Sequence, residues 1–385
     1  MRGRGASSLP GSRTRGPARG PAGSRPGRGG VCGGRRRGAG GWARGQEGRR
    51  GGPGCAATGL GGQPARAGPA GAGAEPAAPT RKREEAAWLP LDVNTAAGPG
   101  QAEGSRRGAS PRGPAQVMKF LKLFGRLKSV VIGMVHVGAL PGTPQSSLPL
   151  TQITDQACHE AEIYKDAGVD GLMVENMHDL PYTVYVGPEI TAAMAVISAA
   201  VKHTCPSLPL GIQILCSANQ QAVAVALASG LDFIRVEGFV FSHVADEGII
   251  NACAGDLLRY RKQIGAQHVQ IFADIKKKHS AHALTADVSI SETAKAAELF
   301  LADGIVLTGT ATGMQADPKE LKEVEHAVKI PVLIGSGVTL ENARNYLDAN
   351  ALIIGSYFKK KGYWANSVDP DRVKKFMDHI GKLRE

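Results

Sequence analysis

The residues from Met118 to the C-terminus predict an α/β protein built as a closed (β/α)8 barrel, the TIM barrel. Eight short runs rich in β-branched and aliphatic residues alternate with amphipathic helical patterns, which is typical of repeated βαβ units. Eight such units in about 250 residues match the size of a closed barrel. A doubly wound open sheet would instead predict a GxGxxG turn after the first strand, and the sequence there reads GALPGTPQSS.

The expected strands cover residues 129–137 and the runs that begin at residues 171, 210, 233, 270, 304, 331 and 351, each followed by a helix. Capping residues support this division of the chain. Ser289 and Glu292 have the spacing of a capping box, and an aspartate precedes a first-turn proline at Asp317 and Asp369. Helix ends are expected at three glycines, Gly168, Gly230 and Gly304.

Residues 1–117 differ sharply in composition from the rest of the chain, because they consist mostly of Gly, Arg, Ala and Pro. They hold 20 Lys/Arg and 6 Asp/Glu, so the other 26 basic and 28 acidic residues are nearly balanced. The basicity belongs to this extension alone, and we expect no nucleic-acid partner. We expect a disordered low-complexity extension, since it cannot bury enough apolar surface to offset chain entropy. Its composition also fits a mitochondrial transit peptide, although an extended start upstream of Met118 is the simpler interpretation.

Residues 118–128, MKFLKLFGRLK, have the pattern of a short basic amphipathic helix. Such a helix fits a cleavable presequence, a membrane-surface contact or a plug at the bottom of the barrel, and we favour the plug. The six cysteines show no metal-ligand spacing, which favours a reducing compartment. No apolar run reaches about 18 residues, so no transmembrane segment is expected.

The active site of this fold lies at the C-terminal ends of the strands, where charged strand residues should face inward. The two-residue period places Arg235 with Glu237, and Asp274 with Lys276, on inward faces, while Glu175 and His136 end the second and first strands. We therefore expect five catalytic residues: Asp274, Glu175, Lys276, His136 and Glu237. In this hypothesis Asp274 and Glu175 exchange protons, and Lys276 and His136 stabilise an oxyanion.

Alternatives to these catalytic roles remain open. Arg235, Glu237 and Asp274 would equally suit a buried ion-pair network that fills the barrel. A Schiff base through Lys276 is conceivable if its pKa is depressed, whereas Lys277 and Lys278 are expected to be solvated. His136, Glu175 and Asp274 form a nitrogen and oxygen donor set without the spacing of a zinc motif. We expect no metal site and no cofactor, and a ligand-borne Mg²⁺ remains compatible with this set.

Glycine turns follow the last two strands, and they predict a phosphate-binding site. The residues are Gly335, Ser336 and Gly337 after the seventh strand and Gly355 and Ser356 after the eighth. Glycines allow backbone N–H groups to approach a phosphate, and a short helix after the eighth strand would add its dipole. Turning the chain from strand to helix is the alternative role of these glycines. Asn176, Arg235, Thr308 and His279 are expected to form a substrate wall.

Long loops at residues 175–189 and 238–255 follow strands at the same end of the barrel, as lids or substrate walls do. They would equally suit a subunit contact in a homo-oligomer.

Four segments together resemble the BtpA/SgcQ family: VIGMVHVGALPGTP, GVDGLMVENMHDLPY, ADIKKKHSAH and LIGSGVTLENA. The resemblance covers nearly all of residues 129–380 and implies a barrel of the ribulose-phosphate-binding kind. One member gave the family its name as a factor for photosystem I accumulation, bacterial members resemble enzymes of carbohydrate or nucleoside metabolism, and animal members look mitochondrial. The extension before Met118 lies outside the family pattern.

These observations predict an enzyme that binds a small phosphorylated molecule, a sugar phosphate or a nucleotide-like compound. The expected chemistry is acid-base isomerisation, or cleavage of a C–C or glycosidic bond by a lyase or hydrolase. The competing hypothesis is a non-catalytic assembly or stability factor that keeps the barrel as a scaffold. The expected location is the mitochondrial matrix, with the cytoplasm as the alternative.

Overall fold

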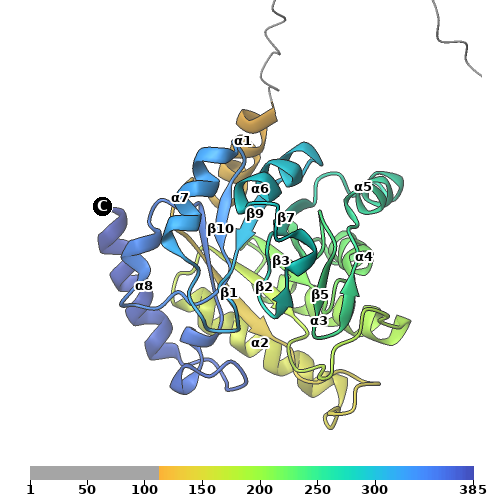
Figure 1. Cartoon of the computed structure of the whole chain (residues 1–385). Coiled ribbons are helices and arrows are strands. Elements are labelled where there is room, and N and C mark those ends of the chain that lie inside the picture. The colour runs from red at the N-terminus through yellow and green to blue at the C-terminus, as the bar shows by residue number, and fades with distance from the viewer. Residues whose placement is uncertain (1–111) are drawn as a thin grey trace, which may run out of the picture. The chain divides into compact units, whose positions relative to one another are not determined.

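Eight parallel strands close into a barrel in the order β1-β11-β10-β9-β7-β4-β3-β2 in the computed structural model, which describes residues 112–385 (Figure 1). The barrel strands are β1 Val130–His136, β2 Gly171–Glu175, β3 Leu210–Gln213, β4 Phe233–Val236, β7 Gln270–Asp274, β9 Gly304–Leu307, β10 Val332–Ile334 and β11 Ala351–Ile354. The predicted barrel is confirmed, with all eight strands where the sequence places them. Disorder was predicted for residues 1–117, of which residues 1–111 lie outside the described residues. The prediction is wrong for residues 112–117, because they belong to helix α1, Arg112–Phe124.

Helices follow seven of the eight barrel strands: α2 Leu150–Asp166, α3 Pro188–Thr204, α4 Asn219–Ser229, α5 Ala254–Gln263, α6 Ile290–Leu299, α7 Pro318–Ala327 and α8 Pro370–Arg384. The expected helix after β10 is replaced by the short 3₁₀ helix η2, Ala343–Tyr346. The Asn342 side chain accepts a hydrogen bond from Thr339 N and donates one to Gly337 O. Such local side-chain bonds compete with a regular helix at this position.

The predicted helix caps are confirmed at three starts and two ends. Ser289 and Glu292 form the capping box, and the Asp317 and Asp369 side chains accept hydrogen bonds from first-turn N–H groups. Gly168 and Gly230 have the left-handed backbone expected at helix ends. The prediction for Gly304 is wrong, because this residue opens β9. A Cβ there would lie 2.9 Å from the Phe272 ring, so close packing inside the barrel requires the glycine.

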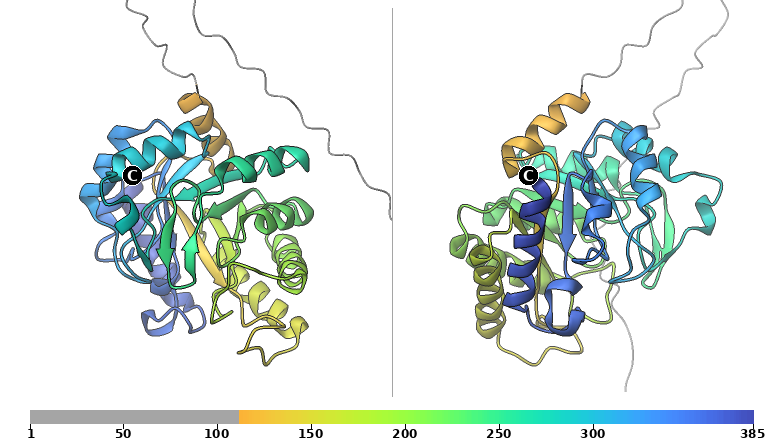
Figure 2. Two further views of the ribbon diagram at one scale, coloured as in Figure 1. Left: turned by 45° about the vertical axis from the view of Figure 1, so that its right-hand side comes forward. Right: turned by 90° about the vertical axis from the view of Figure 1, so that its left-hand side faces the viewer.

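Helix α1, Arg112–Phe124, lies across the end of the barrel where the strands begin (Figures 1 and 2). Phe120 and Phe124 are buried among the inward side chains of the strands. The ring centroids of Phe120 and Phe272 lie 6.1 Å apart, and those of Phe124 and Phe233 lie 5.8 Å apart. The helix starts and ends earlier than the expected 118–128, because Gly125 adopts a left-handed backbone and stops it. This basic amphipathic segment therefore plugs the barrel.

A small antiparallel sheet covers the opposite end of the barrel. It consists of the hairpin β5 His243–Ala245 and β6 Gly248–Ile250, joined by β8 Ser280–Ala281. Beneath it lies an apolar cluster that also contains residues of the 175–189 loop, with Met177, Leu215, Cys216 and Ile250 at its centre. Both long loops thus pack over the C-terminal ends of the strands.

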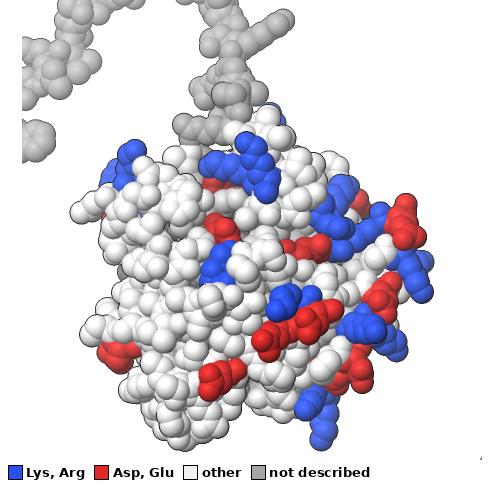
Figure 3. Space-filling model, turned by 180° about the vertical axis from the view of Figure 1, so that it is seen from behind, with Lys and Arg blue, Asp and Glu red and all other residues white. Residues whose placement is uncertain are grey.

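No helix within residues 112–385 is long and apolar enough to cross a membrane. On the face seen in Figure 3, Lys and Arg residues are interspersed with Asp and Glu residues. The similar numbers of basic and acidic residues after residue 117 are thus accompanied by mixing of the two signs on this face.

Candidate active site

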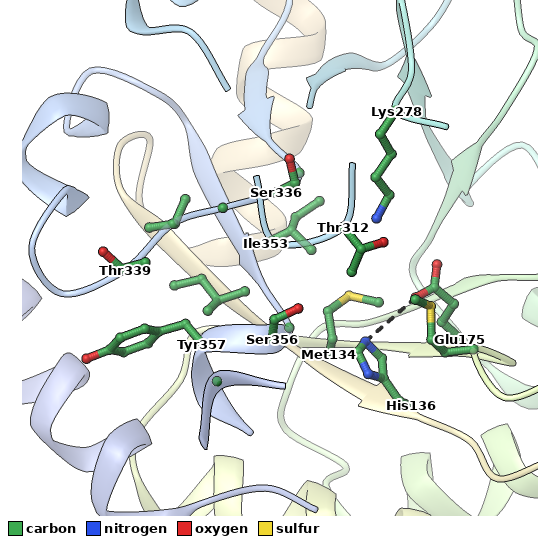
Figure 4. A pocket seen from close by; sticks show the side chains of 18 of the residues that line it. Met134, His136, Glu175, Lys278, Thr312, Ser336, Thr339, Ile353, Ser356 and Tyr357 are labelled. Carbon is green, nitrogen blue, oxygen red and sulfur yellow. Dashed lines mark ion pairs between the residues drawn. The ribbon is translucent and has the colours of Figure 1, made fainter. Parts of the chain in front are cut away.

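A cavity of about 200 Å³ opens at the C-terminal end of the barrel. Eight of the residues predicted from the sequence line it: His136, Glu175, Arg235, Gly335, Ser336, Gly337, Gly355 and Ser356. The turns after β10 and β11 lie on one side of the cavity, and Lys278, Glu175 and His136 lie on the other (Figure 4). The lining also contains residues that the sequence reasoning did not select: Met134, Met177, Lys278, Thr312, Gly313, Val338, Thr339, Ile353, Ile354, Tyr357, Gly362 and Arg372.

The turn after β10 is held by hydrogen bonds to the neighbouring loop. Ser336 Oγ accepts from Gly309 N at 2.7 Å and donates to Met314 O at 2.8 Å. The Ser336 hydroxyl therefore links this turn to the 309–314 loop. The groups of the turn that remain available to a ligand are its backbone N–H groups. The N–H groups of Ser336 and Gly337 have no acceptor among the hydrogen bonds of residues 112–385.

The turn after β11 brings Gly355 against the first strand. A Cβ at Gly355 would lie 3.1 Å from His136 Nε2, so the glycine allows the imidazole to approach the turn. The following helix, η3 Ser356–Phe358, is a single 3₁₀ turn. The helix dipole expected here is therefore small. The Ser356 N–H likewise has no acceptor within the described part of the chain.

Gly337 is the position in these turns where a side chain is least tolerable. Its φ is +69°, and a Cβ would lie 2.2 Å from backbone atoms of Gln315. We expect Gly337→Ala to lower the free energy of unfolding by at least about 2 kcal/mol, because it combines left-handed strain with a backbone clash. Urea denaturation measures this loss. In α8, Gly381 has open space around it, so Gly381→Ala should leave stability level or raise it by up to about 1 kcal/mol. Equal effects of the two changes would contradict the tight turn.

His136 and Glu175 lie side by side in the cavity. They are register partners at the ends of β1 and β2, and His136 Nε2 lies 3.8 Å from Glu175 Oε2. His136 Nδ1 lies 3.0 Å from the carbonyl oxygen of Trp364, which can only accept, so Nδ1 carries the proton. Burial, and then the Lys359 ammonium, lower the pKa of His136 well below its ordinary range. The ring is therefore neutral, and Nε2 is a free base that faces the cavity.

Burial raises the pKa of Glu175 above its ordinary value, although Lys278 and Arg235 oppose the shift. The carboxyl group can thus hold or release a proton nearer to neutral pH than an exposed glutamate can. His136 Nε2 therefore offers an acceptor beside a carboxyl group whose protonated form is more accessible than that of an exposed glutamate.

Lys278, and not Lys276, is the lysine that enters the cavity (Figure 4). The inward alternation predicted for Lys276 is wrong, because β7 ends at Asp274 and Lys276 has a left-handed φ of +45°. Its Nζ donates instead to the backbone and hydroxyl oxygens of Thr285. The prediction that Lys277 and Lys278 are solvated is also wrong, since Lys277 is buried and lies 3.2 Å from Glu237.

Arg235 and Asp274 form the buried ion pair that was the alternative to a catalytic role. Arg235 Nε lies 3.2 Å and 3.0 Å from the two carboxylate oxygens, and Nη2 lies 2.9 Å from one of them. Arg235 reaches the cavity, whereas Asp274 does not line it. Glu237 is similarly occupied, because it pairs with Lys277 and accepts from Ser217 N, and these contacts keep the pKa of its carboxyl low against the effect of burial. Neither carboxylate is free to exchange protons with a ligand in this arrangement.

Three residues of the expected substrate wall support the site from outside the cavity. Asn176 is bonded to the backbone of Leu215 and to Asp179, so it joins two loops. Thr308 Oγ1 accepts from Lys278 N at 2.9 Å and so fixes the backbone of that lysine. His279 Nε2 accepts from Thr312 N at 3.0 Å.

Arg372 is the other cation of the cavity that sequence reasoning missed. Its Nε donates to Tyr357 O, and its guanidinium carbon lies 4.4 Å from the centre of the Tyr357 ring. The residue belongs to the first turn of α8, far from any strand end, so strand periodicity carries no signal for it.

His243 lies beside the Glu237 and Lys277 pair, and it predicts an acid-sensitive stability. Burial, and then the Lys277 ammonium, lower the pKa of His243 from 6.5 to about 4. Below pH 6.5 the unfolded chain binds a proton that the folded chain refuses, so the free energy of unfolding falls between pH 6.5 and about 4. The slope contributed is up to about 1.4 kcal/mol per pH unit. Urea denaturation at pH 7, 6 and 5 should show a flatter slope for His243→Gln, and equal slopes would contradict the shift.

Residues 112–385 contain no group of three or more His, Cys, Asp or Glu side chains arranged to hold a metal ion. The cavity is lined by backbone amides and by side chains that include Lys278, Arg235, Arg372, Glu175 and His136.

Relatives of this chain occur in animals, archaea and cyanobacteria. An uncharacterised mitochondrial protein of Caenorhabditis elegans is 49% identical over 268 residues, which span 68% of this chain and 97% of the relative. The photosystem I biogenesis protein BtpA of a Synechocystis strain is 35% identical over 255 residues, 66% of this chain and 88% of the relative.

Among solved structures, a thiamine phosphate pyrophosphorylase from Pyrococcus furiosus is similar with a TM-score of 0.43 and 14% identity, over 67% of this chain and 97% of that one. The model of the BtpA family matches residues 127–382. That match covers well over half of the chain and includes every barrel strand and every residue of the cavity, so this protein belongs to the BtpA family.

Proposed function

We propose that this protein is an enzyme that acts on a small phosphorylated metabolite of about the size of a sugar monophosphate. One observation carries the proposal. A single cavity holds backbone N–H groups without protein acceptors on one side and Lys278, Glu175 and His136 on the other. This division into an anion-binding half and an acid-base half is what an enzyme of this class requires.

The anion-binding half consists of the turns after β10 and β11, where the N–H groups of Ser336, Gly337 and Ser356 are available. Arg372, whose guanidinium packs against the Tyr357 ring next to the turn after β11, also lines the cavity. Backbone amides and arginine are the usual ligands of phosphate in proteins, and the last two strands are where barrels commonly bind it. Phosphate is therefore the group that this half fits best.

The size of the cavity narrows the substrate class. Pockets for drug-sized ligands measure about 300–1,000 Å³, whereas this cavity measures about 200 Å³. A sugar monophosphate fits that volume better than a larger nucleotide-like compound does.

The acid-base half supports proton transfer on the carbon chain of the ligand. The neutral Nε2 of His136 is a base, and the Glu175 carboxyl, whose pKa is raised by burial, can donate a proton. Two such groups side by side serve isomerisation or the cleavage of a bond adjacent to a carbonyl. We also propose a location in the mitochondrial matrix, which the 49% identity to a mitochondrial protein of Caenorhabditis elegans supports.

Ser356 provides the sharpest test of phosphate binding. Its hydroxyl lines the cavity (Figure 4), and within residues 112–385 it has no hydrogen-bond partner, so replacing it removes no protein hydrogen bond. We expect inorganic phosphate and sugar monophosphates to raise the melting temperature of the full chain, because ligand binding stabilises the folded state. Ser356→Asp should abolish the increase through charge repulsion, while the matched neutral variant Ser356→Asn should retain much of it.

Calorimetric titration of the same three proteins checks that the increase reflects binding. Equal phosphate affinity in the wild type and in Ser356→Asp would contradict the proposed site. Absence of binding by every phosphorylated compound would contradict the proposed function and favour the non-catalytic scaffold.

A further inference from the structure

Three consecutive lysines follow β7, and the structure uses them in three different ways. Lys276 Nζ donates to Thr285 at 2.7 Å and 3.2 Å, and Lys277 Nζ lies 3.2 Å from Glu237. Lys278 Nζ points into the cavity (Figure 4) and has no hydrogen bond or ion pair to any residue of the described chain. A largely buried ammonium without a partner is costly, so its surroundings favour the neutral amine.

Burial and one neighbouring cation outweigh the carboxylates around Lys278. Burial, and then the guanidinium of Arg235, lower the pKa of Lys278 below its ordinary value. The carboxylates of Glu175, Asp274 and Glu237 oppose this shift. Asp274 is paired with Arg235 and Glu237 with Lys277, so Glu175 is the opposing carboxylate without a lysine or arginine partner. A lower pKa makes the neutral amine of a lysine more accessible, and the neutral amine is the form with the lone pair that a nucleophile needs.

The amine is also held in place and supplied with proton-transfer groups. Thr308 Oγ1 accepts from Lys278 N, which fixes the backbone at the base of the side chain. Glu175 and His136 lie on the same side of the cavity as Lys278, opposite the turns that we propose for phosphate (Figure 4). A ligand whose phosphate occupies those turns would extend its carbon chain toward Nζ.

We propose that Lys278 forms an imine with the carbonyl carbon of a phosphorylated ketone or aldehyde, an inference that rests on the proposed function. The Nζ lone pair adds to the carbonyl carbon, the oxygen takes a proton from the Glu175 carboxyl, and Nζ gives a proton to His136 Nε2. The carbinolamine oxygen then takes the proton that His136 now holds and leaves as water, which gives a protonated imine, neutral His136 and the Glu175 carboxylate. No electrons are gained or lost overall. The imine withdraws electrons from the adjacent C–H or C–C bond, so the reaction class is ketose-aldose isomerisation or aldol-type cleavage.

Borohydride trapping tests the imine directly. The full chain is incubated separately with dihydroxyacetone phosphate, glyceraldehyde 3-phosphate and ribulose 5-phosphate, each with sodium cyanoborohydride, and is then digested for peptide mass spectrometry. We expect the mass of a reduced adduct on Lys278 with at least one of the three compounds. Lys278→Met should lose this adduct, and Lys276→Arg should keep it, because the Lys276 ammonium bonds Thr285 outside the cavity.

Calorimetric titration of the wild type and of Lys278→Met with inorganic phosphate separates this inference from the proposed function. We expect Lys278→Met to bind inorganic phosphate, which would show that the variant is folded and that its phosphate turns are intact. Phosphate binding by the wild type without any adduct on Lys278 would overturn the imine and leave the phosphate site standing. Adducts confined to exposed lysines, or unchanged in Lys278→Met, would also overturn the imine. A wild type that binds no phosphate and forms no adduct would overturn both proposals.

Glu175→Gln adds a kinetic readout. If Glu175 supplies the proton for carbinolamine formation, the adduct should form about 100-fold more slowly in this variant, with phosphate affinity nearly unchanged. An unchanged trapping rate would overturn the proton-donating role that the proposal assigns to Glu175.

Discussion

Replacing Arg235 with methionine is expected to lower the free energy of unfolding by about 3–5 kcal/mol, one of the two largest effects among these predictions. The side chains of Arg235 and Asp274 are only 3% and 1% exposed, and they share three hydrogen bonds. Without the guanidinium, the Asp274 carboxylate has no donor within residues 112–385 and stays buried. Urea denaturation at neutral pH measures the loss.

A double variant distinguishes the buried charge from a simple packing defect. Arg235→Met combined with Asp274→Leu removes both charges and should recover most of the lost stability, because apolar replacements for a buried ion pair are often neutral. The exposed pair of Lys128 and Asp348, 64% and 67% exposed, is the matched control, and Lys128→Met should cost less than about 1 kcal/mol. A double variant no more stable than Arg235→Met would contradict the argument.

Truncating Phe120 in the plug helix is expected to cost about 3–5 kcal/mol of unfolding free energy. The ring is fully buried and lies 4.8 Å from the Phe124 ring and 6.1 Å from the Phe272 ring, measured between centroids. Phe120→Ala would leave a cavity between α1 and the inward side chains of the barrel. Urea denaturation of the full chain gives the measurement. Leu127→Ala, at a more exposed position just after the helix, should change stability by no more than about 0.5 kcal/mol.

Comparable losses from Phe120→Ala and Leu127→Ala would mean that α1 does not plug the barrel. A loss confined to Phe120→Ala would show that the helix is part of the folded core.

Sequence periodicity predicts the barrel well, because each strand and each cap depends on residues close together in the chain. The neighbouring positions of His136 and Glu175 also follow, since both residues end adjacent strands of a parallel barrel. Alternation fails at Lys276, where the backbone leaves the extended conformation and Lys278 becomes the inward lysine. The two-residue alternation predicts which side chains point inward only within the strand, and it gives no information about the residues that follow.

Partnerships between distant segments are the other part of the site that sequence patterns do not predict. The inward position of Asp274 follows from alternation, but its engagement by Arg235 depends on side chains from two strands 39 residues apart. Arg372 and Thr312 reach the cavity from a helix start and a loop, where no period applies. The prediction of a helix after β10 is wrong for a related reason, because the Asn342 side chain forms hydrogen bonds with the backbone of the turn.

The plug helix limits how the N-terminus of this protein can be processed. Residues 112–124 have the basic amphipathic character of an import signal, yet Phe120 and Phe124 form the floor of the barrel. A peptidase that cut after Phe124 would expose the rings of Phe233 and Phe272 to water, and the product would be unstable and prone to aggregation. Any maturation cleavage compatible with a folded barrel must therefore fall before Phe120, so a removable signal would have to be a different segment of the chain from the plug helix.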